Sequence, residues 1–321
     1  MNRYLLTILA LLLLAVVLQV QAQQRPQYSQ YMLNNYLLNP AITGIEDYAD
    51  IKVSHRRQWV GLDGAPVTTY LTAHTPLNKG AASTKYHRAL AHHGVGVAFH
   101  TDKTGPLRRT GLTGSYAYHL PLTNSINVSA GAAVGIIRNS VNASDLEFTN
   151  PNDPLVSGGS FNNNVVDLNL GLWLYSKNFS VGVAGAQLLE NVGSFRQEGN
   201  NNPGLDLQRH YFVTGAYRLS PTEKIDVIPS VMLKLADPSP ASVDASVRVI
   251  YSQQFWAGAS YRHEDALVAM VGVYVNPLID ISYSYDATLS NLNRVSAGTH
   301  EVVVGFKLLN TRRIICPQWI W

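Results

Sequence analysis

The chain has 321 residues, a formal net charge of +3 and only 14% charged residues, against about 25% in average soluble domains. So small a positive charge gives no indication of nucleic-acid binding. The single cysteine, Cys316, excludes an internal disulfide. Low charge combined with 17 Tyr and 24 Gly is typical of a β-barrel whose strands meet lipid on one side.

The first residues have the pattern of a secretory signal peptide. Arg3 supplies a basic start, an apolar run extends from Leu5 to Leu18, and Val20-Gln21-Ala22 offers small residues for cleavage. The run is too short to span a bilayer comfortably. We therefore expect residues 1–22 to be removed, which leaves a mature chain with a net charge of about +2.

Residues 23–47 precede the first predicted strand, yet they are too apolar for a free tail. Their apolar residues are Tyr28, Tyr31, Met32, Tyr36, Leu37 and Leu38. We expect an ordered segment that packs into the lumen of a barrel or against its periplasmic mouth. Within it, Asn39-Pro40 is predicted to end a short helical turn.

From residue 48 to residue 308, alternating segments of about ten residues recur. In the segment Val166–Tyr175, the even positions are all Val or Leu, whereas the odd positions include Asp167, Asn169 and Trp173. Because successive strand residues point to opposite faces, one face is apolar and the other mostly polar. The predicted fold is therefore all-β, a single antiparallel outer-membrane barrel of about fourteen strands. The predicted strands lie near 48–57, 66–75, 94–102, 110–120, 126–138, 164–176, 178–187, 209–219, 224–235, 241–252, 254–263, 266–275, 278–287 and 299–308.

The lengths of the connections favour a barrel over a soluble sandwich. We number the connections between predicted strands in chain order. All the long connections are odd-numbered except 76–93, and the even-numbered connections other than 76–93 are short. The long odd connections lie at 139–163, 188–208 and 288–298. Outer-membrane barrels sort their connections in this way, with short periplasmic turns and long surface loops. A soluble sandwich has no reason to do so.

Connection 76–93 is the exception, a long connection on the predicted periplasmic side. Its cations include Lys79, Lys85 and Arg88, and it has no acidic residue. A basic excursion of this kind suits an acidic periplasmic partner, because charge complementarity speeds encounter. A disordered insertion is the alternative.

The mature sequence resembles the PorP/SprF family of outer-membrane proteins in the Bacteroidota type IX secretion and gliding machinery. The motifs that carry the resemblance are Tyr28-Ser29-Gln30-Tyr31-Met32, Asn39-Pro40-Ala41-Ile42-Thr43-Gly44, Arg57-Gln58-Trp59, Gly64-Ala65-Pro66, Thr75-Pro76-Leu77, Gly94-Val95-Gly96, Thr104-Gly105-Pro106, Tyr116-Ala117-Tyr118-His119-Leu120, Phe255-Trp256-Ala257-Gly258, Tyr283-Ser284-Tyr285-Asp286 and Gly298-Thr299-His300-Glu301. They cover nearly the whole mature chain. One departure is the tail at 309–321, since family members commonly stop at the aromatic end of the last strand.

The resemblance implies a non-enzymatic barrel in the cell outer membrane, in contact with its lipid. It also implies two kinds of protein partner: a large adhesin-like surface protein that the barrel helps to export or anchor, and a periplasmic lipoprotein of the machinery. A passive or plugged pore unrelated to secretion is the alternative. The residues themselves indicate no cofactor.

The histidines and serines give weak indications of chemistry. His87, His92 and His93 form the densest histidine group, but no Cys or paired carboxylate lies close by, so the ligand set for a metal is incomplete. A solvated basic loop is the favoured interpretation. No Gly-x-Ser-x-Gly motif is present, although a Ser/His/Asp triad assembled in space leaves no local motif to read.

Arg56, Arg57 and Trp59 lie at the predicted outer end of the first strand. Arg and Trp are typical anchors of protein interfaces, so these residues are candidates for binding a surface partner. The alternative places Trp59 in the aromatic girdle and the arginines at the membrane interface or in the lumen. Cys316, in the tail, is interpreted as an ordinary thiol.

Overall fold

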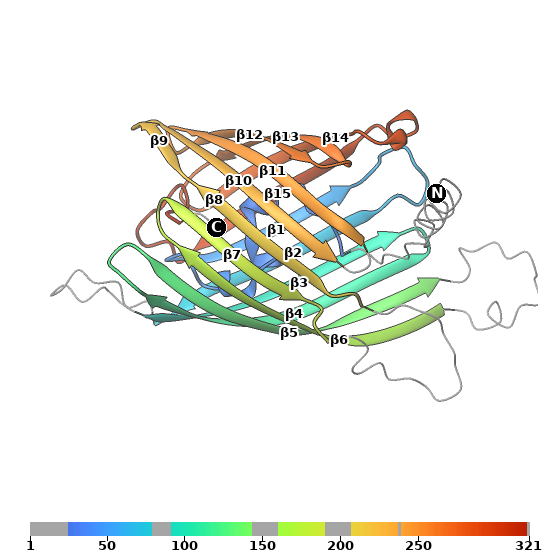
Figure 1. The fold of residues 1–321 in the computed structure, drawn as a ribbon, viewed down its shortest axis with the longest axis horizontal. Coiled ribbons are helices and arrows are strands. Elements are labelled where there is room, and N and C mark those ends of the chain that lie inside the picture. The colour runs from blue at the N-terminus through green and yellow to red at the C-terminus, as the bar shows by residue number, and fades with distance from the viewer. Residues whose placement is uncertain (1–24, 79–90, 143–159, 190–206, 237–238, 320–321) are drawn as a thin grey trace, which may run out of the picture.

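The computed structural model describes residues 25–78, 91–142, 160–189, 207–236 and 239–319. They form one antiparallel sheet that closes on itself, because β1 pairs with β15 and β10 pairs with β11 (Figure 1). Among these residues, no helix is both long enough and apolar enough to cross a membrane. The predicted all-β barrel is confirmed.

Fifteen strands are assigned, but β8 and β9 together form one strand of the wall. Both pair with β10, β8 at Ala216↔Ser230 and β9 at Thr222↔Ile225. The wall therefore has fourteen strands, as the sequence predicted. The strands are β1 (Ala49–Arg57), β2 (Val67–Leu77), β3 (His92–Thr104), β4 (Leu107–Pro121), β5 (Asn127–Asn142), β6 (Ser160–Tyr175), β7 (Phe179–Ala186), β8 (His210–Tyr217), β9 (Leu219–Thr222), β10 (Ile225–Ala236), β11 (Ser239–Tyr251), β12 (Phe255–Arg262), β13 (Ala266–Tyr274), β14 (Ile279–Thr288) and β15 (Thr299–Leu308).

The alternation of residue types places apolar side chains outside and polar or aromatic ones inside. On β6, Leu170 and Leu172 are 46% and 59% exposed, whereas Asp167 and Trp173 are 3% and 1% exposed. Exposed apolar residues continue around the outer wall and form the surface that meets lipid. Each inward-facing polar group must find a partner within the lumen.

The barrel has two unlike ends. We call the end at which β1 finishes and β2 begins the loop end, and the opposite end the turn end. Of the turn-end connections that the structure describes completely, 122–126, 176–178, 223–224, 252–254 and 275–278 are all short, as predicted. Most of the long exception, 79–90, lies outside the described residues, as does the predicted signal peptide.

Residues 25–48 thread the lumen from the loop end to the turn end. Ser29 bonds to Asp286 at the loop end of β14, whereas the Gly44 amide bonds to His74 of β2 near the turn end. Nearly every side chain from Tyr28 to Tyr48 is buried. The predicted order of this segment is confirmed.

The lumenal segment contains three short 3-10 helices, namely η1 (Tyr31–Leu33), η2 (Asn35–Leu37) and η3 (Pro40–Ile42). A helical turn does end just before Asn39-Pro40, as predicted, but the same pair also begins the next one. The Asn39 side chain accepts a hydrogen bond from the Ala41 amide at 2.9 Å, and Pro40 occupies the first helical position, where its lost N–H costs least. Another 3-10 helix, η5 (Asn291–Arg294), lies between β14 and β15.

Wall glycines allow the backbone of the segment to approach the sheet. A Cβ on Gly131 of β5 would collide with the backbone of Pro40 and Ala41. On the segment itself, Gly44 has φ +76°, and a Cβ there would lie 2.6 Å from Gly94, so both its conformation and its contact require glycine. A side chain at these positions would push the segment off the wall.

We predict that Gly131→Leu displaces the lumenal segment while the barrel still forms, because overpacking costs about 1–3 kcal/mol. In limited proteolysis of the purified barrel, residues 25–48 should survive in the wild type and be cut in the variant. Gly114→Leu is the matched control, since Gly114 is exposed and its nearest neighbour lies 4.0 Å from the added carbon. Equal protection in the wild type and in Gly131→Leu would contradict this packing.

Candidate functional site

A buried ionic cluster joins the lumenal segment to the wall at the loop end. The Arg56 guanidinium lies 3.3 Å from Asp286 and 3.7 Å from Glu301. Ser29 of the segment donates its hydroxyl to Asp286 at 2.7 Å, and its amide donates to Glu301 at 2.7 Å. The wall alone does not complete this cluster, because Ser29 supplies two of the bonds to its carboxylates.

Arg262 extends the cluster along the neighbouring strands. Its guanidinium contacts Asp244 at 3.2 Å, Asp265 at 2.9 Å and Asp286 at 3.6 Å. Asp286 therefore faces Arg56 and Arg262 together. Removing one partner from a buried pair leaves an uncompensated charge, which is strongly destabilising. This network holds β1, β11, β12, β14 and β15 around the start of the segment.

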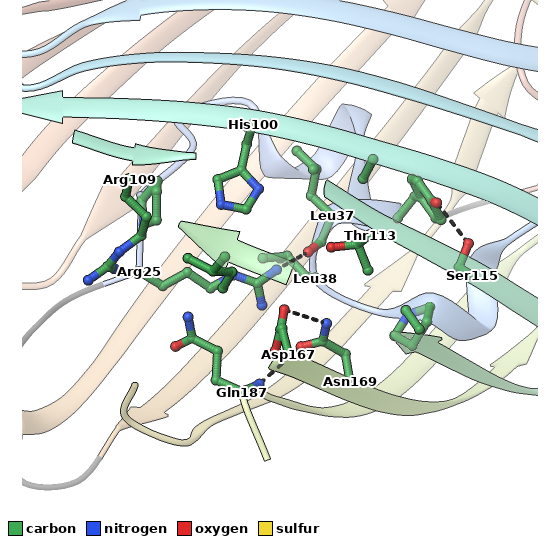
Figure 2. A pocket seen from close by; sticks show the side chains of 16 residues that line it. Arg25, Leu37, Leu38, His100, Arg109, Thr113, Ser115, Asp167, Asn169 and Gln187 are labelled. Atoms are coloured by element: carbon green, nitrogen blue, oxygen red, sulfur yellow. Dashed lines mark hydrogen bonds between the residues drawn. The ribbon is translucent and has the colours of Figure 1, made fainter. Parts of the chain in front are cut away.

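A small cavity remains in the middle of the lumen, between the segment and β3–β6 (Figure 2). Arg25 donates to the Leu37 carbonyl at 2.8 Å, while its other terminal nitrogen and one oxygen of Asp167 have no protein partner. The cavity has a volume of about 40 Å³, enough for a few water molecules. A cavity of this size is too small to serve by itself as a passage for solutes.

The turn end is closed by the C-terminal tail. Arg218 donates to the Pro317 and Gln318 carbonyls at 3.3 and 3.4 Å, and the Trp319 ring packs edge-on against Tyr175 at 5.2 Å. Lys307 donates to the Ile315 carbonyl. Cys316 is half-buried, and burial raises the pKa of its thiol. The tail is therefore part of the lumen's filling.

Three tyrosines of the segment support its fixed position. The side chains of Tyr28, Tyr31 and Tyr36 are all buried. Tyr36 is 2.8 Å from the Ser115 hydroxyl on β4, and Tyr28 packs edge-on against Tyr70 of β2. The segment is anchored along its whole length rather than at one point.

The structure separates the site residues proposed from the sequence. Arg56 points into the lumen, whereas Arg57 is exposed on the outer face of β1. Trp59 lies in the β1–β2 connection with φ +46°, and its amide donates to Thr299 at 3.1 Å. The candidate cations Lys79, Lys85 and Arg88 lie outside the described residues.

The histidine group is divided in a similar way. His92 and His93 belong to β3 rather than to a solvated loop, because the strand begins two residues earlier than predicted. His92 is buried beside the Gly44 carbonyl at 3.1 Å, and His93 faces Tyr116 outside the wall. His87 lies outside the described residues, and within the described ranges no group of ligands suited to a metal ion is found.

At the loop end, the wall has a feature that the sequence pattern does not indicate. β6 pairs with β5 over its whole length, but its pairs with β7 cover only Leu170–Tyr175. The last contact is the Leu168 carbonyl, which accepts from the Leu188 amide at 3.0 Å. In Figure 1, β5 and β6 run well beyond β7 on the loop side.

Beyond Leu168, the described part of the chain places no strand against this edge of β6. Backbone groups of successive strand residues point alternately to the two neighbouring strands, so those of Asn162, Asn164 and Val166 point the same way as those of Leu168. No strand among the described residues pairs with them. Natural edges are commonly protected by Lys, Pro or a bulge, and Asn162–Val166 contains neither Lys nor Pro.

We predict that Arg56→Leu lowers the free energy of unfolding by about 3 kcal/mol or more, because Asp286 and Glu301 lose a buried partner. Arg57→Leu, one residue further along the chain, should change it by less than about 0.5 kcal/mol. Urea unfolding in detergent micelles, followed by tryptophan fluorescence, measures both variants. Equal losses in the two variants would show that the cluster does not secure the barrel.

Comparisons with known proteins agree with this architecture. A search of curated proteins finds no match. Among solved structures, the TodX ΔS2S3 mutant monoaromatic hydrocarbon channel aligns with a TM-score of 0.50 at 11% identity, over 86% of this chain and 94% of that one. The CymD monoaromatic hydrocarbon channel has a TM-score of 0.49 at 12% identity, over 87% and 92%. The Pseudomonas putida toluene transporter TodX has 0.48 at 11%, over 85% and 93%. At such identities the likeness concerns the fold alone.

The family model for the type IX secretion system membrane protein PorP/SprF matches residues 20–306. This range covers the lumenal segment and the barrel up to the last strand. The chain belongs to the PorP/SprF family of type IX secretion membrane proteins.

Proposed function

We propose that this outer-membrane protein is a non-enzymatic accessory of type IX secretion that holds an exported, adhesin-like protein at the cell surface. The supporting observation is the combination of a filled lumen with an open strand edge at the loop end. The described residues of the lumenal segment and the tail fill much of the lumen, which disfavours the alternative of a passive pore. The open edge provides a place where another chain can bind.

The proposed orientation places the loop end outside the cell and the turn end in the periplasm. The short connections of the turn end support it, since outer-membrane barrels keep short turns on the periplasmic side. With a rise of roughly 3.3 Å per residue, the free part of β6 reaches beyond the outward apolar residues Leu170 and Leu172. The edge then stands where an exported chain emerges.

The edge suits β-augmentation, in which an extended peptide adds a strand through main-chain hydrogen bonds. Asn162 and Asn164 are exposed on the outer face. On the inner face, Val165 packs with Ile137 and Leu207 in a small apolar cluster. An added strand with alternating polar and apolar residues would match both faces.

We predict that Asn164→Pro depletes the exported partner from the cell surface, because proline removes the edge-facing N–H. Asn164→Ala keeps that N–H and should behave as wild type. Proline is tolerated on edge strands, so the barrel should still form. Quantitative surface proteomics of both variants, with a gene deletion as reference, measures the effect.

The deletion should deplete one or a few large surface proteins, and Asn164→Pro should deplete the same ones several-fold. An unchanged surface proteome in the deletion, with altered solute uptake, would favour a pore. Depletion in the deletion but not in Asn164→Pro would keep the secretion role and reject the edge as its binding site.

We further propose that connection 76–93 docks a periplasmic lipoprotein of the machinery through its basic residues. The supporting pattern is a run of cations without an acid, on the side where other connections are minimal. Replacing residues 79–90 with a four-residue turn should leave the barrel intact but reduce export. Full export from such a barrel would reject docking.

The same connection tests the orientation. A cysteine introduced as Ser83→Cys should resist an impermeant thiol reagent in whole cells, whereas one introduced as Asp63→Cys, in the exposed β1–β2 connection, should react. Ready labelling at position 83 would invert the proposed topology.

A further inference from the structure

Four cations lie together on the outer face of the wall near the loop end. Arg57 on β1, Lys103 on β3, Arg108 on β4 and Arg138 on β5 all have exposed side chains. They face away from the lumen, since each follows the alternation of the lipid-facing residues on its strand. No part of the export role described above uses them as a group.

The strand register brings these cations close together. Lys103 is directly opposite Arg108, and Arg138 is opposite Thr110, two residues from Arg108. Directly opposite side chains have Cβ atoms roughly 5 Å apart, and diagonal neighbours roughly 7–8 Å. Arg57 joins the row through Val67, which pairs with both Arg57 and Lys103. Thr101 lies opposite Thr110 and adds hydroxyl groups to the same surface.

Within the described residues, the cluster has no carboxylate counter-ion. None of the four cations forms an ion pair with a carboxylate in the described parts of the chain, including Asp63 in the nearby β1–β2 connection. Like charges placed directly opposite on a sheet destabilise it, so the Lys103–Arg108 pair carries a cost unless an anion lies between them. The guanidinium groups of Arg108 and Arg138 are suited to bidentate binding of phosphate.

An apolar surface begins directly beside the cations, toward the turn end. Phe99 on β3, Leu112 on β4 and Ile136 on β5 are exposed on the same outer face. Ile136 lies two residues from Arg138, and Leu112 lies four residues from Arg108. A ligand complementary to this surface would therefore carry negative charge at one end and hydrocarbon at the other.

We propose that Arg57, Lys103, Arg108 and Arg138 form a binding site for a phosphorylated lipid of the outer leaflet, with the phosphate among the cations and acyl chains along Phe99, Leu112 and Ile136. The choice of a lipid follows from position, because the cations lie on the outer face at the loop-end margin of the wall, directly beside the apolar band that meets lipid. The choice of leaflet rests on the orientation proposed above.

The test compares two probes, diphosphorylated lipid A and the same lipid stripped of its phosphates, added to the purified barrel in detergent and counted by native mass spectrometry. The test variant is K103Q/R108Q/R138Q. The matched control is K177Q/K224Q/R313Q, which removes the same charge from exposed cations near the turn end. Heat-modifiable gel mobility verifies that both variants fold.

The wild type and the control should retain the phosphorylated probe at least tenfold more tightly than the stripped one. The test variant should lose that preference, and the preference should weaken as salt is raised. Equal retention of both probes by the wild type, or unchanged preference in the test variant, would overturn the proposal. Unchanged lipid retention with loss of a surface protein from cells would assign the cluster to a protein partner instead.

Discussion

The structure depends on how the polar groups on the inner face of a closed barrel find hydrogen-bond and ion-pair partners. Fourteen strands enclose a lumen whose inward faces carry buried arginines, lysines and carboxylates. Left without partners, such groups would cost more than the surrounding wall can offset. Residues 25–48 supply part of what is missing: Ser29 bonds to Asp286 and Glu301, Asn34 donates to Thr72, and Asn39 donates to the Leu172 carbonyl. The lumenal segment and the wall therefore complete each other.

This constraint also determines where function can reside. Because the segment and the C-terminal tail both occupy the barrel, the cavity between the segment and β3–β6 holds only a few waters. Transport through the lumen would require the segment to leave the wall. It would then lose the contacts of Ser29 with Arg56, of Tyr36 with Ser115 and of Gly44 with His74, which are distributed from the loop end to the turn end. The side chains and backbone groups of the outer wall and of the loop-end rim are accessible without any such rearrangement. A filled barrel is accordingly suited to act as a platform in the membrane.

Much of the wall could be predicted from the sequence because alternation is a local signal. Strand β14 was predicted as 278–287 and is observed as Ile279–Thr288. Prediction was weaker where both faces are polar. The first residues of β6 include Asn162, Asn163 and Asn164, which show no alternation, so the extension that creates the open edge was missed. The segment before Gly94 likewise shows no alternation, so the sequence does not place His92 and His93 in β3.

The path of the lumenal segment could not be predicted, although its burial could. Its apolar residues indicated packing against the barrel, but its direction is set by contacts such as that of Ser29 with Glu301, separated by 272 positions. Nothing in the sequence indicates that these two residues are partners. Likewise, Arg56 and Arg57 appear as equivalent anchors in the sequence. Only the register separates them, sending one into the ionic cluster and the other to the outer face.

The register also explains why the notable features of the outer surface lie on one side of the barrel. Strands β5 and β6 extend farther toward the loop end than β7 does (Figure 1). Among the described residues, this side therefore combines a long outer wall with an edge that no strand pairs with. Asn164, on that edge, is directly opposite Arg138. A strand added to β6 would therefore be separated by β6 alone from β5, the strand that carries this cation. A lipid phosphate held there would neutralise the adjoining surface and permit a partner of either charge to approach. The unequal height of the wall thus places the proposed lipid site and the proposed docking edge within reach of each other.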